Sequence, residues 1–294
     1  MQISANGISL EVEDHGPANG EPILLVMGLG MQLVAWPTGF VASLVARGFR
    51  VIRFDNRDIG LSQRFDQFGT PNMVREALRF TLGLKIDAPY TLAAMADDAA
   101  GLLDALGLAS AHVCGASMGG MIAQLLAVRH PARVKSLTLM MTSSGARRLP
   151  GPTLRVRRAL MSRPKDPGSV PSIIEHYLKL YKLIGSPGYP IGDAELHTLL
   201  SASVSRSYRP QGSARQMLAI AADGDRSPLL AALKLPTQII HGQDDPLLPL
   251  PVGRDLASKI AGAEFDVIPG MGHDLPSPLW PRFVAGIANA AGRA

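Results

Sequence analysis

The sequence predicts an α/β fold, a mostly parallel β-sheet with helices on both faces and one helical insertion. Short apolar runs typical of buried parallel strands alternate with longer segments of helical spacing along most of the chain. Only residues 147–226 interrupt this alternation. The chain has 294 residues, 47% of them hydrophobic and 18% charged, so it can bury a large core.

The strands are predicted from two patterns. Residues 8–14 alternate apolar and polar side chains, which favours an antiparallel strand at a sheet edge. The other expected strands are almost wholly apolar and lie at residues 22–27, 50–55, from 111 to the turn at 115, 135–141, 237–241 and 264–268. The helices expected between and after them cover residues 36–48, 90–107, 118 to about 130, 252–260 and 279–291.

The stretch at 147–226 contains many prolines, helix-like pieces at 172–184 and 193–203, and no clear strand. A loop of this length is uncommon inside a compact domain. We therefore expect a helical cap between the sixth and seventh strands of a full sheet, and a core built from residues 1–146 and 227–294. Such an insertion lies over the carboxyl ends of the strands, where open α/β sheets bind ligands.

Composition limits the partners. The net charge is +5, and the basic clusters at 147–148 and 155–158 lack the interleaved aromatic residues of a nucleic-acid surface, so we interpret them as solvated helix faces or loops. The only cysteine, Cys114, excludes internal disulfides and zinc clusters and is expected to be buried. No signal peptide or membrane-spanning run is visible. We expect a cytoplasmic protein, monomer or homodimer, with neither nucleic acid nor membrane as partner.

The clearest chemical motif is Gly115-Ala-Ser-Met-Gly119, between a strand and a helix. In this context G-x-S-x-G predicts a nucleophile elbow, in which a serine is exposed on a strained turn at a helix N-terminus. Small residues are needed around Ser117 because the helix folds back across the strand. The alternative is a glycine-rich turn whose serine only caps the helix.

A serine nucleophile needs a general base, and the base needs an orienting acid. In sheets of this kind the chain order is serine, acid, histidine, with the last two after later strands. Of the seven histidines, only His273 lies in a glycine-flanked loop after the last strand. Asp245 is the preferred acid and Asp244 its rival. Asp274 is disfavoured because it is adjacent to the base.

The oxyanion hole requires two backbone donors. One is expected at Met118, directly after the nucleophile, and the other in the loop at residues 28–30 after the first buried strand. Glycines in this loop let the backbone approach a ligand, although a tight turn alone would also explain them.

Together these stretches resemble the α/β-hydrolase superfamily, with the nearest likeness to the aclacinomycin methylesterase-like esterases. The shared segments are 24–28, Trp36-Pro37 with Phe40, 51–62, 115–119, 245–246 and 269–276. The resemblance implies an eight-stranded, mostly parallel sheet with an inserted cap. It also implies Ser117 as nucleophile, Asp245 as acid, His273 as base, and Leu29 and Met118 as oxyanion donors, without metal or cofactor. Many relatives have His-Gly where this chain has Met27-Gly28, a change that leaves the backbone donor in place.

Other residues have two interpretations. We interpret the charged segment 57–62 as a buried or half-buried ion pair and a turn that hold the loop beside the elbow. We take Gly28, Trp36, Tyr177 and Tyr181 as contacts of the substrate. For Trp36 and the apolar cap residues, plain core packing is the alternative; the further cap residues in question are Leu180, Ile184 and Met217.

The expected function is hydrolysis of carboxylic esters of small to medium apolar substrates through an acyl-enzyme intermediate, with a small-molecule ester as partner. The same residues also suit cleavage of a carbon–carbon bond or formation of a peracid. A non-catalytic ligand receptor on this scaffold is the third possibility. The cap sets substrate choice, and it is the part that matches the family least.

Overall fold

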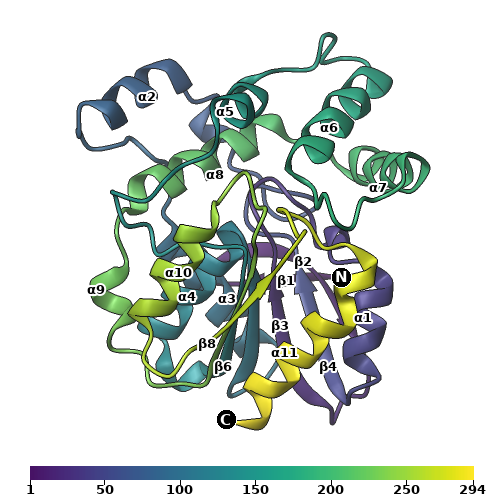
Figure 1. The fold of residues 1–294 in the computed structure, drawn as a ribbon, viewed down its shortest axis with the longest axis vertical. Coiled ribbons are helices and arrows are strands. Elements are labelled where there is room, and N and C mark those ends of the chain that lie inside the picture. The colour runs from purple at the N-terminus through teal and green to yellow at the C-terminus, as the bar shows by residue number, and fades with distance from the viewer.

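A single eight-stranded sheet forms the centre of the computed structural model, which describes residues 1–294 (Figure 1). The strand order is β1-β2-β4-β3-β5-β6-β7-β8. The six neighbouring strands β4, β3, β5, β6, β7 and β8 all pair in parallel, whereas β2 runs antiparallel to both of its neighbours. The predicted mostly parallel sheet is therefore confirmed. The strands are β1 (Gln2–Ala5), β2 (Ile8–His15), β3 (Glu21–Val26), β4 (Phe49–Phe54), β5 (Ala111–Ala116), β6 (Val134–Met140), β7 (Thr237–Gly242) and β8 (Glu264–Ile268).

The sheet edge differs from the prediction. β2 is antiparallel as expected, but it is not the edge strand, because β1 pairs along its outer side from Gln2 to Ala5. The connecting turn is Asn6-Gly7, with φ of 49° and 73°. Positive φ at both positions suits a type I′ hairpin turn, for which Asn-Gly is the preferred sequence. This dipeptide was the signal that could have predicted the extra strand.

Helices cover both faces of the sheet, as predicted. α1 and α11 pack on one face around an apolar cluster that includes Phe40 and Phe283, while α3, α4 and α10 pack on the other around Leu102 and Ile122. The α-helices are α1 (Thr38–Val45), α2 (Met73–Thr81), α3 (Leu92–Ala105), α4 (Met118–Arg129), α5 (Leu154–Met161), α6 (Val170–Ile184), α7 (Asp193–Arg206), α8 (Pro210–Asp223), α9 (Ser227–Leu230), α10 (Leu250–Lys259) and α11 (Trp280–Gly292). Short 3₁₀ helices lie at Leu33–Ala35, Asp66–Phe68, Pro131–Arg133 and Ser277–Leu279.

The first helix begins later than predicted. It starts at Thr38, because Trp36 and Pro37 are both extended, with ψ of 109° and 140°. A residue before proline is driven out of the helical region by the proline ring. Trp36 therefore lies in the connection that enters α1.

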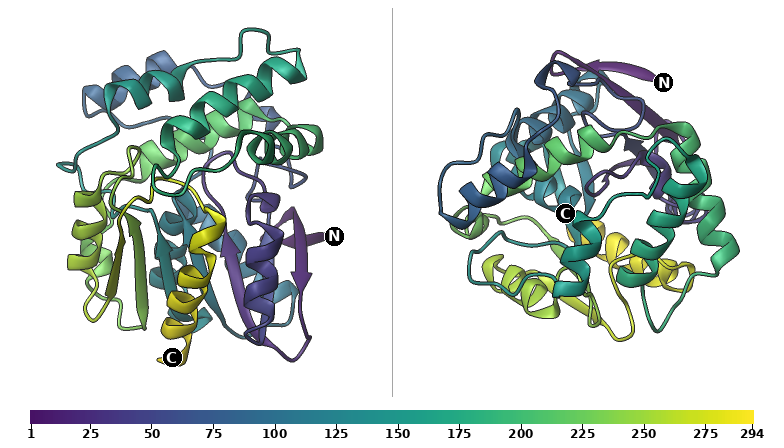
Figure 2. Two further views of the ribbon diagram at one scale, coloured as in Figure 1. Left: turned by 45° about the vertical axis from the view of Figure 1, so that its right-hand side comes forward. Right: turned by 90° about the horizontal axis from the view of Figure 1, so that it is seen from above.

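Helices α5–α8 lie within the predicted insertion at residues 147–226, and α9 follows it before β7. α5, α6, α7 and α8 form a layer beyond the carboxyl ends of the parallel strands (Figures 1 and 2). The two ends of this segment lie together, since the Arg226 N–H donates to the Ser144 carbonyl at 2.9 Å. The domain boundaries at 147 and 226 remain predictions.

Helix α2 was not predicted, although it lies at the same end of the molecule as the cap helices (Figures 1 and 2). It belongs to the connection between β4 and α3. Val74 and Leu78 are four residues apart, as on one face of a helix, but both side chains are exposed. α2 thus adds to the cap layer, although it does not belong to the insertion between β6 and β7.

The crossing of β5 and α4 depends on the absence of side chains. A Cβ added to Gly119 would lie 2.0 Å from the Val26 carbonyl oxygen, and one added to Gly115 would lie 2.3 Å from the Gly119 carbonyl oxygen. Both obstacles are backbone atoms that cannot move aside without displacing β3 or α4. Glycine is therefore the residue that fits at these two positions.

We expect Gly119→Ala to lower the free energy of unfolding by ~3 kcal/mol or more, because the added methyl overlaps the β3 backbone. The measurement is chemical denaturation followed by circular dichroism. Gly292→Ala is the control, since Gly292 is helical and nothing lies within 4 Å of the added Cβ. The control should change stability by less than ~1 kcal/mol. Equal effects of the two substitutions would contradict the packing argument.

Candidate active site

Ser117 lies on the turn between β5 and α4, as the motif predicted. Its φ of 54° and ψ of −121° place a non-glycine residue in a strained conformation. The Ser117 N–H donates to the Met140 carbonyl and the Thr142 hydroxyl donates to the Ser117 carbonyl. These bonds from β6 and the loop after it hold the strained backbone, while the side chain stays partly exposed at the helix N-terminus.

The structure brings Ser117, His273 and Asp245 together. The His273 Nε2 lies 3.0 Å from the Ser117 Oγ, and the His273 Nδ1 lies 2.7 Å from the Asp245 Oδ2. An ionised carboxylate only accepts hydrogen bonds, so Nδ1 carries the proton and Nε2 is left to accept from the serine. The Asp245 side chain is fully buried, and its other oxygen accepts the N–H groups of Leu247 and Leu248, both at 2.8 Å.

The rival carboxylates face elsewhere. Asp244 is exposed and accepts the Gly270 N–H at 2.8 Å. Asp274 is bonded to the hydroxyl and N–H of Ser186, and burial raises the pKa of its carboxyl. Neither makes a hydrogen bond to the His273 ring. Of the alternatives left open by the sequence, only Asp245 contacts the histidine.

The remaining buried histidines have structural contacts. The His241 Nε2 lies 2.7 Å from the Leu248 carbonyl oxygen, and burial lowers the pKa of the ring. The His112 Nδ1 lies 2.8 Å from the Ser136 hydroxyl. Cys114 is buried as predicted, and burial raises the pKa of its thiol. No three His, Cys, Asp or Glu side chains are grouped as ligands for a metal ion.

The loop after β3 passes directly beside the serine. A Cβ on Gly28 would lie 3.2 Å from the Ser117 Cβ, so the Leu29 peptide is held close to the hydroxyl. The N–H groups of Leu29 and Met118, the two expected oxyanion donors, make no hydrogen bond to a loop, a turn or a side chain. The next N–H along the loop is already engaged, because Gly30 donates to the Gln216 side chain at 2.9 Å.

Gln216 is a residue of this site that sequence reasoning missed. It is fully buried on α8. Its oxygen accepts the Gly30 N–H, and its nitrogen donates to the Arg57 carbonyl at 2.9 Å. The cap thus fixes the orientation of the loop that carries Leu29. A glutamine in a helix gives no sequence signal of such a role.

The cap also holds the loop that carries His273. The His273 N–H donates to the Ile184 carbonyl at 2.7 Å, at the end of α6. The Ser186 hydroxyl accepts the Gly272 N–H at 2.9 Å, and the Gly188 N–H donates to the Gly270 carbonyl at 2.8 Å. The connection between α6 and α7 therefore lies against the histidine loop over several residues.

The predicted substrate contacts lie in different surroundings. Trp36 is fully buried and stacks on Phe40 with ring centroids 5.7 Å apart, within the core cluster under α1. Tyr181 extends from α6 to the loop after β3, where its hydroxyl contacts the Met31 sulfur at 2.6 Å. Tyr177 is half-buried, and burial together with Tyr208 raises its pKa to about 12. Their contact with substrate remains a prediction, as does that of Gly28.

Buried ion pairs connect the charged segment 57–62 to its surroundings, as interpreted from the sequence. Arg57 pairs with Asp98 of α3 at 2.6 Å, and both side chains are buried. Asp58 pairs with Arg215 of the cap helix α8 at 2.5 Å and also accepts the Tyr90 hydroxyl. The hydrogen bond to Asp58 raises the pKa of Arg215.

A second pair joins the cap to the loop after β4. The Arg206 guanidinium lies 2.7 Å from the fully buried Asp55 carboxylate. Burial raises the pKa of Asp55, while hydrogen bonds from the Leu33 and Leu61 N–H groups and from Arg206 oppose this shift. The Arg206 guanidinium also donates to the Gln32 side chain. Two arginines of the cap thus neutralise two buried aspartates of the core.

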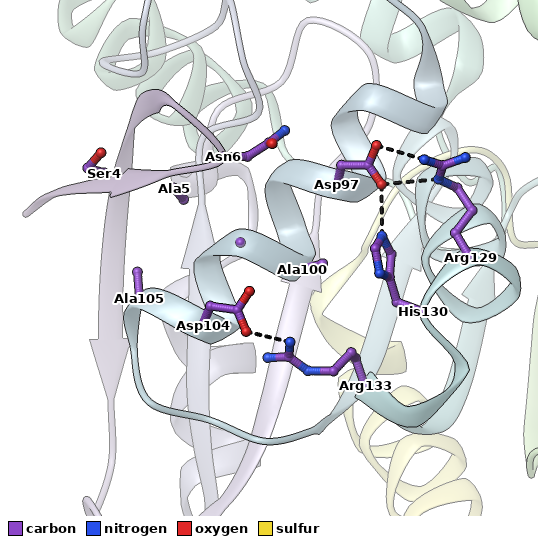
Figure 3. A pocket seen from close by; sticks show the side chains of 11 residues that line it. Ser4, Ala5, Asn6, Asp97, Ala100, Asp104, Ala105, Arg129, His130 and Arg133 are labelled. Atoms are coloured by element: carbon purple, nitrogen blue, oxygen red, sulfur yellow. Dashed lines mark hydrogen bonds and ion pairs between the residues drawn. The ribbon is translucent and has the colours of Figure 1, made fainter.

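A separate surface hollow lies between β1, α3 and α4, where Figure 3 shows its lining side chains. Arg129 and His130 both contact Asp97, and Arg133 contacts Asp104 (Figure 3). Its cations are therefore neutralised by neighbouring carboxylates. None of the predicted catalytic residues lines this hollow.

A mostly parallel eight-stranded sheet with a serine on the strained turn after the fifth strand is the architecture of the α/β-hydrolase class. The family model for the alpha/beta hydrolase fold matches residues 21–169, and the chain belongs to this superfamily. The family predicted from the sequence is therefore confirmed.

Particular relatives cover nearly the whole chain. It is similar to the rhodomycin D methylesterase DauP of Streptomyces sp. (strain C5), with 29% identity over 97% of this chain and 95% of the relative. The 2-hydroxymuconate semialdehyde hydrolase of Pseudomonas sp. (strain CF600) is 30% identical over 92% of this chain and 86% of its own. Among solved structures, a thermophilic esterase from Thermogutta terrifontis superposes with a TM-score of 0.71 and 27% identity, covering 98% and 96% of the two chains. The expected likeness to methylesterases of the aclacinomycin type is also confirmed.

We expect Arg215→Met to lower the free energy of unfolding by ~3–5 kcal/mol, because it leaves the Asp58 carboxylate buried without its cation. Adding Asp58→Asn removes that charge and should restore part of the loss. Chemical denaturation of the single and double variants measures both effects.

The control for this prediction is Arg282→Met, which removes a surface ion pair with Asp266. The Arg282 side chain in this pair is about half exposed. An exposed pair of this kind contributes less than ~1 kcal/mol. If Arg215→Met costs no more than Arg282→Met, the buried pair does not anchor the cap.

Proposed function

We propose that this chain is a serine hydrolase that cleaves carboxylic esters of small to medium apolar substrates. The observation that carries the proposal is the unbroken hydrogen-bond chain from the Ser117 hydroxyl through the His273 ring to the buried Asp245 carboxylate. The similarity to methylesterases and to a solved esterase supports the same reaction. No helix is long and apolar enough to cross a bilayer; cytoplasmic location and a monomeric or homodimeric state remain predictions.

The proposed reaction has two halves. The Ser117 oxygen attacks the ester carbonyl while its proton passes to the His273 Nε2, and the N–H groups of Met118 and Leu29 stabilise the oxyanion. The same proton then goes to the departing alcohol, which leaves an acyl group on the serine. Water attacks this acyl carbon with His273 as base, the carboxylic acid departs, and Ser117 recovers its proton.

The surroundings of each group support its role. Asp245 cannot rotate freely, because its second oxygen is fixed by two N–H groups, and it therefore holds the His273 ring with Nε2 towards the serine. Leu29 and Met118 have N–H groups with no partner in the loops and turns around them. Donors that are positioned in advance need no reorganisation when negative charge develops.

A second candidate keeps the same residues but cleaves a carbon–carbon bond. The 30% identity to a 2-hydroxymuconate semialdehyde hydrolase favours it. A panel that compares methyl and p-nitrophenyl esters with ring-cleavage products separates the two reactions. An esterase turns over the esters with the higher kcat/KM, and a carbon–carbon hydrolase turns over the ring-cleavage products instead.

We expect Ser117→Ala to reduce kcat/KM on p-nitrophenyl esters by at least about 10³-fold, because the acyl-enzyme can no longer form. A fluorophosphonate probe should label the wild-type chain and leave this variant unlabelled. Ser258→Ala, a change of an exposed helix serine whose hydroxyl contacts only the Asp255 carbonyl, is the control and should retain full activity. Activity of Ser117→Ala within about tenfold of wild type contradicts the mechanism. Failure of the wild type to react with the probe would favour a non-catalytic receptor.

The acid is tested by comparing two neighbours. We expect Asp245→Asn to lower kcat by at least about 10³-fold, because its amide N–H₂ would face Nδ1 and place the histidine proton on Nε2. Asp244→Asn keeps an acceptor for the Gly270 N–H and should stay within about tenfold of wild type. Steady-state kinetics of both variants measures the difference. The reverse order of effects would assign the acid to Asp244.

A further inference from the structure

One segment of the cap carries an unusual concentration of positive charge. Residues 147–166 contain seven cations and a single acid, Asp166, so this segment has a net charge of +6 while the whole chain has +5. The rest of the chain is therefore close to neutral, at −1. The seven cations are Arg147, Arg148, Arg155, Arg157, Arg158, Arg163 and Lys165.

These cations have no counter-charge in the chain. All seven are exposed, and none of them forms an ion pair. The Arg157 side chain donates to the Pro152 carbonyl, and the side chains of the other six make no hydrogen bond. Elsewhere most arginines are neutralised by carboxylates, as Arg129 is by Asp97. Free cations gathered on one segment form a surface suited to an external anion.

Exposed apolar side chains gather at the same end of the molecule. Of thirteen exposed large hydrophobic residues, seven lie on α2, the turn after it, and α5. Val74, Leu78 and Leu82 follow at intervals of four, so they share one face of the helix and its end. The seven are Val74, Leu78, Phe80, Leu82, Leu84, Leu154 and Met161, all more than half exposed.

The outward side of α2 also lacks free negative charge. Its only acid, Glu76, is buried and contacts Arg75, and the exposed Asp87 beyond the end of the helix also pairs with Arg75 at 3.4 Å. Arg75, Arg79 and Lys85 lie among the apolar residues. α2 and α5 both lie at the cap end (Figures 1 and 2). We call residues 73–85 and 147–165 together the basic apolar surface.

We propose that the basic apolar surface docks this protein onto an anionic lipid bilayer. Exposed apolar side chains on a short helix enter the boundary between headgroups and acyl chains, and cations beside them contact anionic headgroups. The contact is peripheral, since no helix can span a membrane. It revises the expectation, drawn from the absence of a spanning segment, that the protein has no membrane partner.

Two other occupants fit the surface less well. A second copy of the chain docked through the same face would bring a segment of +6 against another of +6, which is repulsive. Single-stranded nucleic acid is bound through cations together with stacked aromatic rings, and Phe80 is the only aromatic residue in the surface. Duplex nucleic acid offers phosphates to the cations but no apolar phase for the exposed hydrophobic side chains. A bilayer requires neither a matching shape nor fixed hydrogen-bond geometry, in agreement with exposed cations that make almost no polar contacts.

The test is co-sedimentation of the full chain with large unilamellar vesicles of phosphatidylglycerol and phosphatidylcholine in equal parts, with pure phosphatidylcholine vesicles in parallel. We expect binding to the anionic vesicles, little binding to the neutral ones, and release as the NaCl concentration rises. Arg155→Glu with Arg158→Glu should reduce the vesicle partition coefficient by at least about tenfold, since each cation near an anionic surface contributes a severalfold factor. Leu78→Ser with Phe80→Ser should reduce it by at least about fivefold.

Matched controls carry the same changes elsewhere. Arg47→Glu with Arg254→Glu reverses two exposed, unpaired arginines outside the cap, and Leu229→Ser replaces an exposed leucine on α9. Both should bind vesicles like the wild type, and all variants should keep wild-type activity on a soluble ester, which shows that they fold.

The proposal is overturned if anionic vesicles do not sediment the chain at low salt, or if test and control variants bind equally. It is overturned in favour of self-association if sedimentation velocity shows a dimer that Leu78→Ser with Phe80→Ser dissociates. Binding to single-stranded DNA that exceeds binding to anionic vesicles would also overturn it, in favour of nucleic acid.

Discussion

The close approach of α4 to β3 is the constraint on which the rest of the site depends. At Gly119 the helix backbone lies so near the Val26 carbonyl that no side chain fits between them. This crossing fixes where the chain must turn after β5, and the turn forces Ser117 into positive φ. The strained serine is thereby held beside the loop after β3 and within hydrogen-bond distance of His273 in the loop after β8, which in turn contacts Asp245 in the loop after β7.

His273 and Asp245 are held by contacts of very different origin. Asp245 is fixed locally, by two N–H groups of its own loop. His273 depends instead on the cap, because its N–H is bonded to the Ile184 carbonyl and its loop lies against residues 186–188. On the other side of the serine, Gln216 of α8 holds the loop that contains Leu29. The insertion is therefore part of the scaffold of the site as well as its cover.

The sequence predicted those features whose cause is local. Apolar runs located the inner strands, and the G-x-S-x-G motif with the chain order of Asp245 and His273 brought out three residues that the fold places within hydrogen-bond distance. Single side chains that reach across the structure could not be found in this way, because Gln216 and Arg206 gain their contacts only from tertiary packing. Strand β1 and helix α2 were missed for different reasons. β1 has a local signal in the Asn6-Gly7 turn and is the exception among the locally determined features. The apolar spacing of α2, in contrast, does not mark a buried face.

The distribution of polar contacts also shows how each part of the cap is held to the core. α7 and α8 carry Arg206 and Arg215, whose partners Asp55 and Asp58 are buried, and separating these pairs would leave carboxylates in an apolar interior without cations. α5 has no such contact, since its side-chain hydrogen bonds stay within residues 152–162. Polar contacts therefore hold α7 and α8 to the core more firmly than they hold α5. Gln216 also lies on α8, so the loop that carries Leu29 is held by one of the two helices whose arginines pair with buried aspartates.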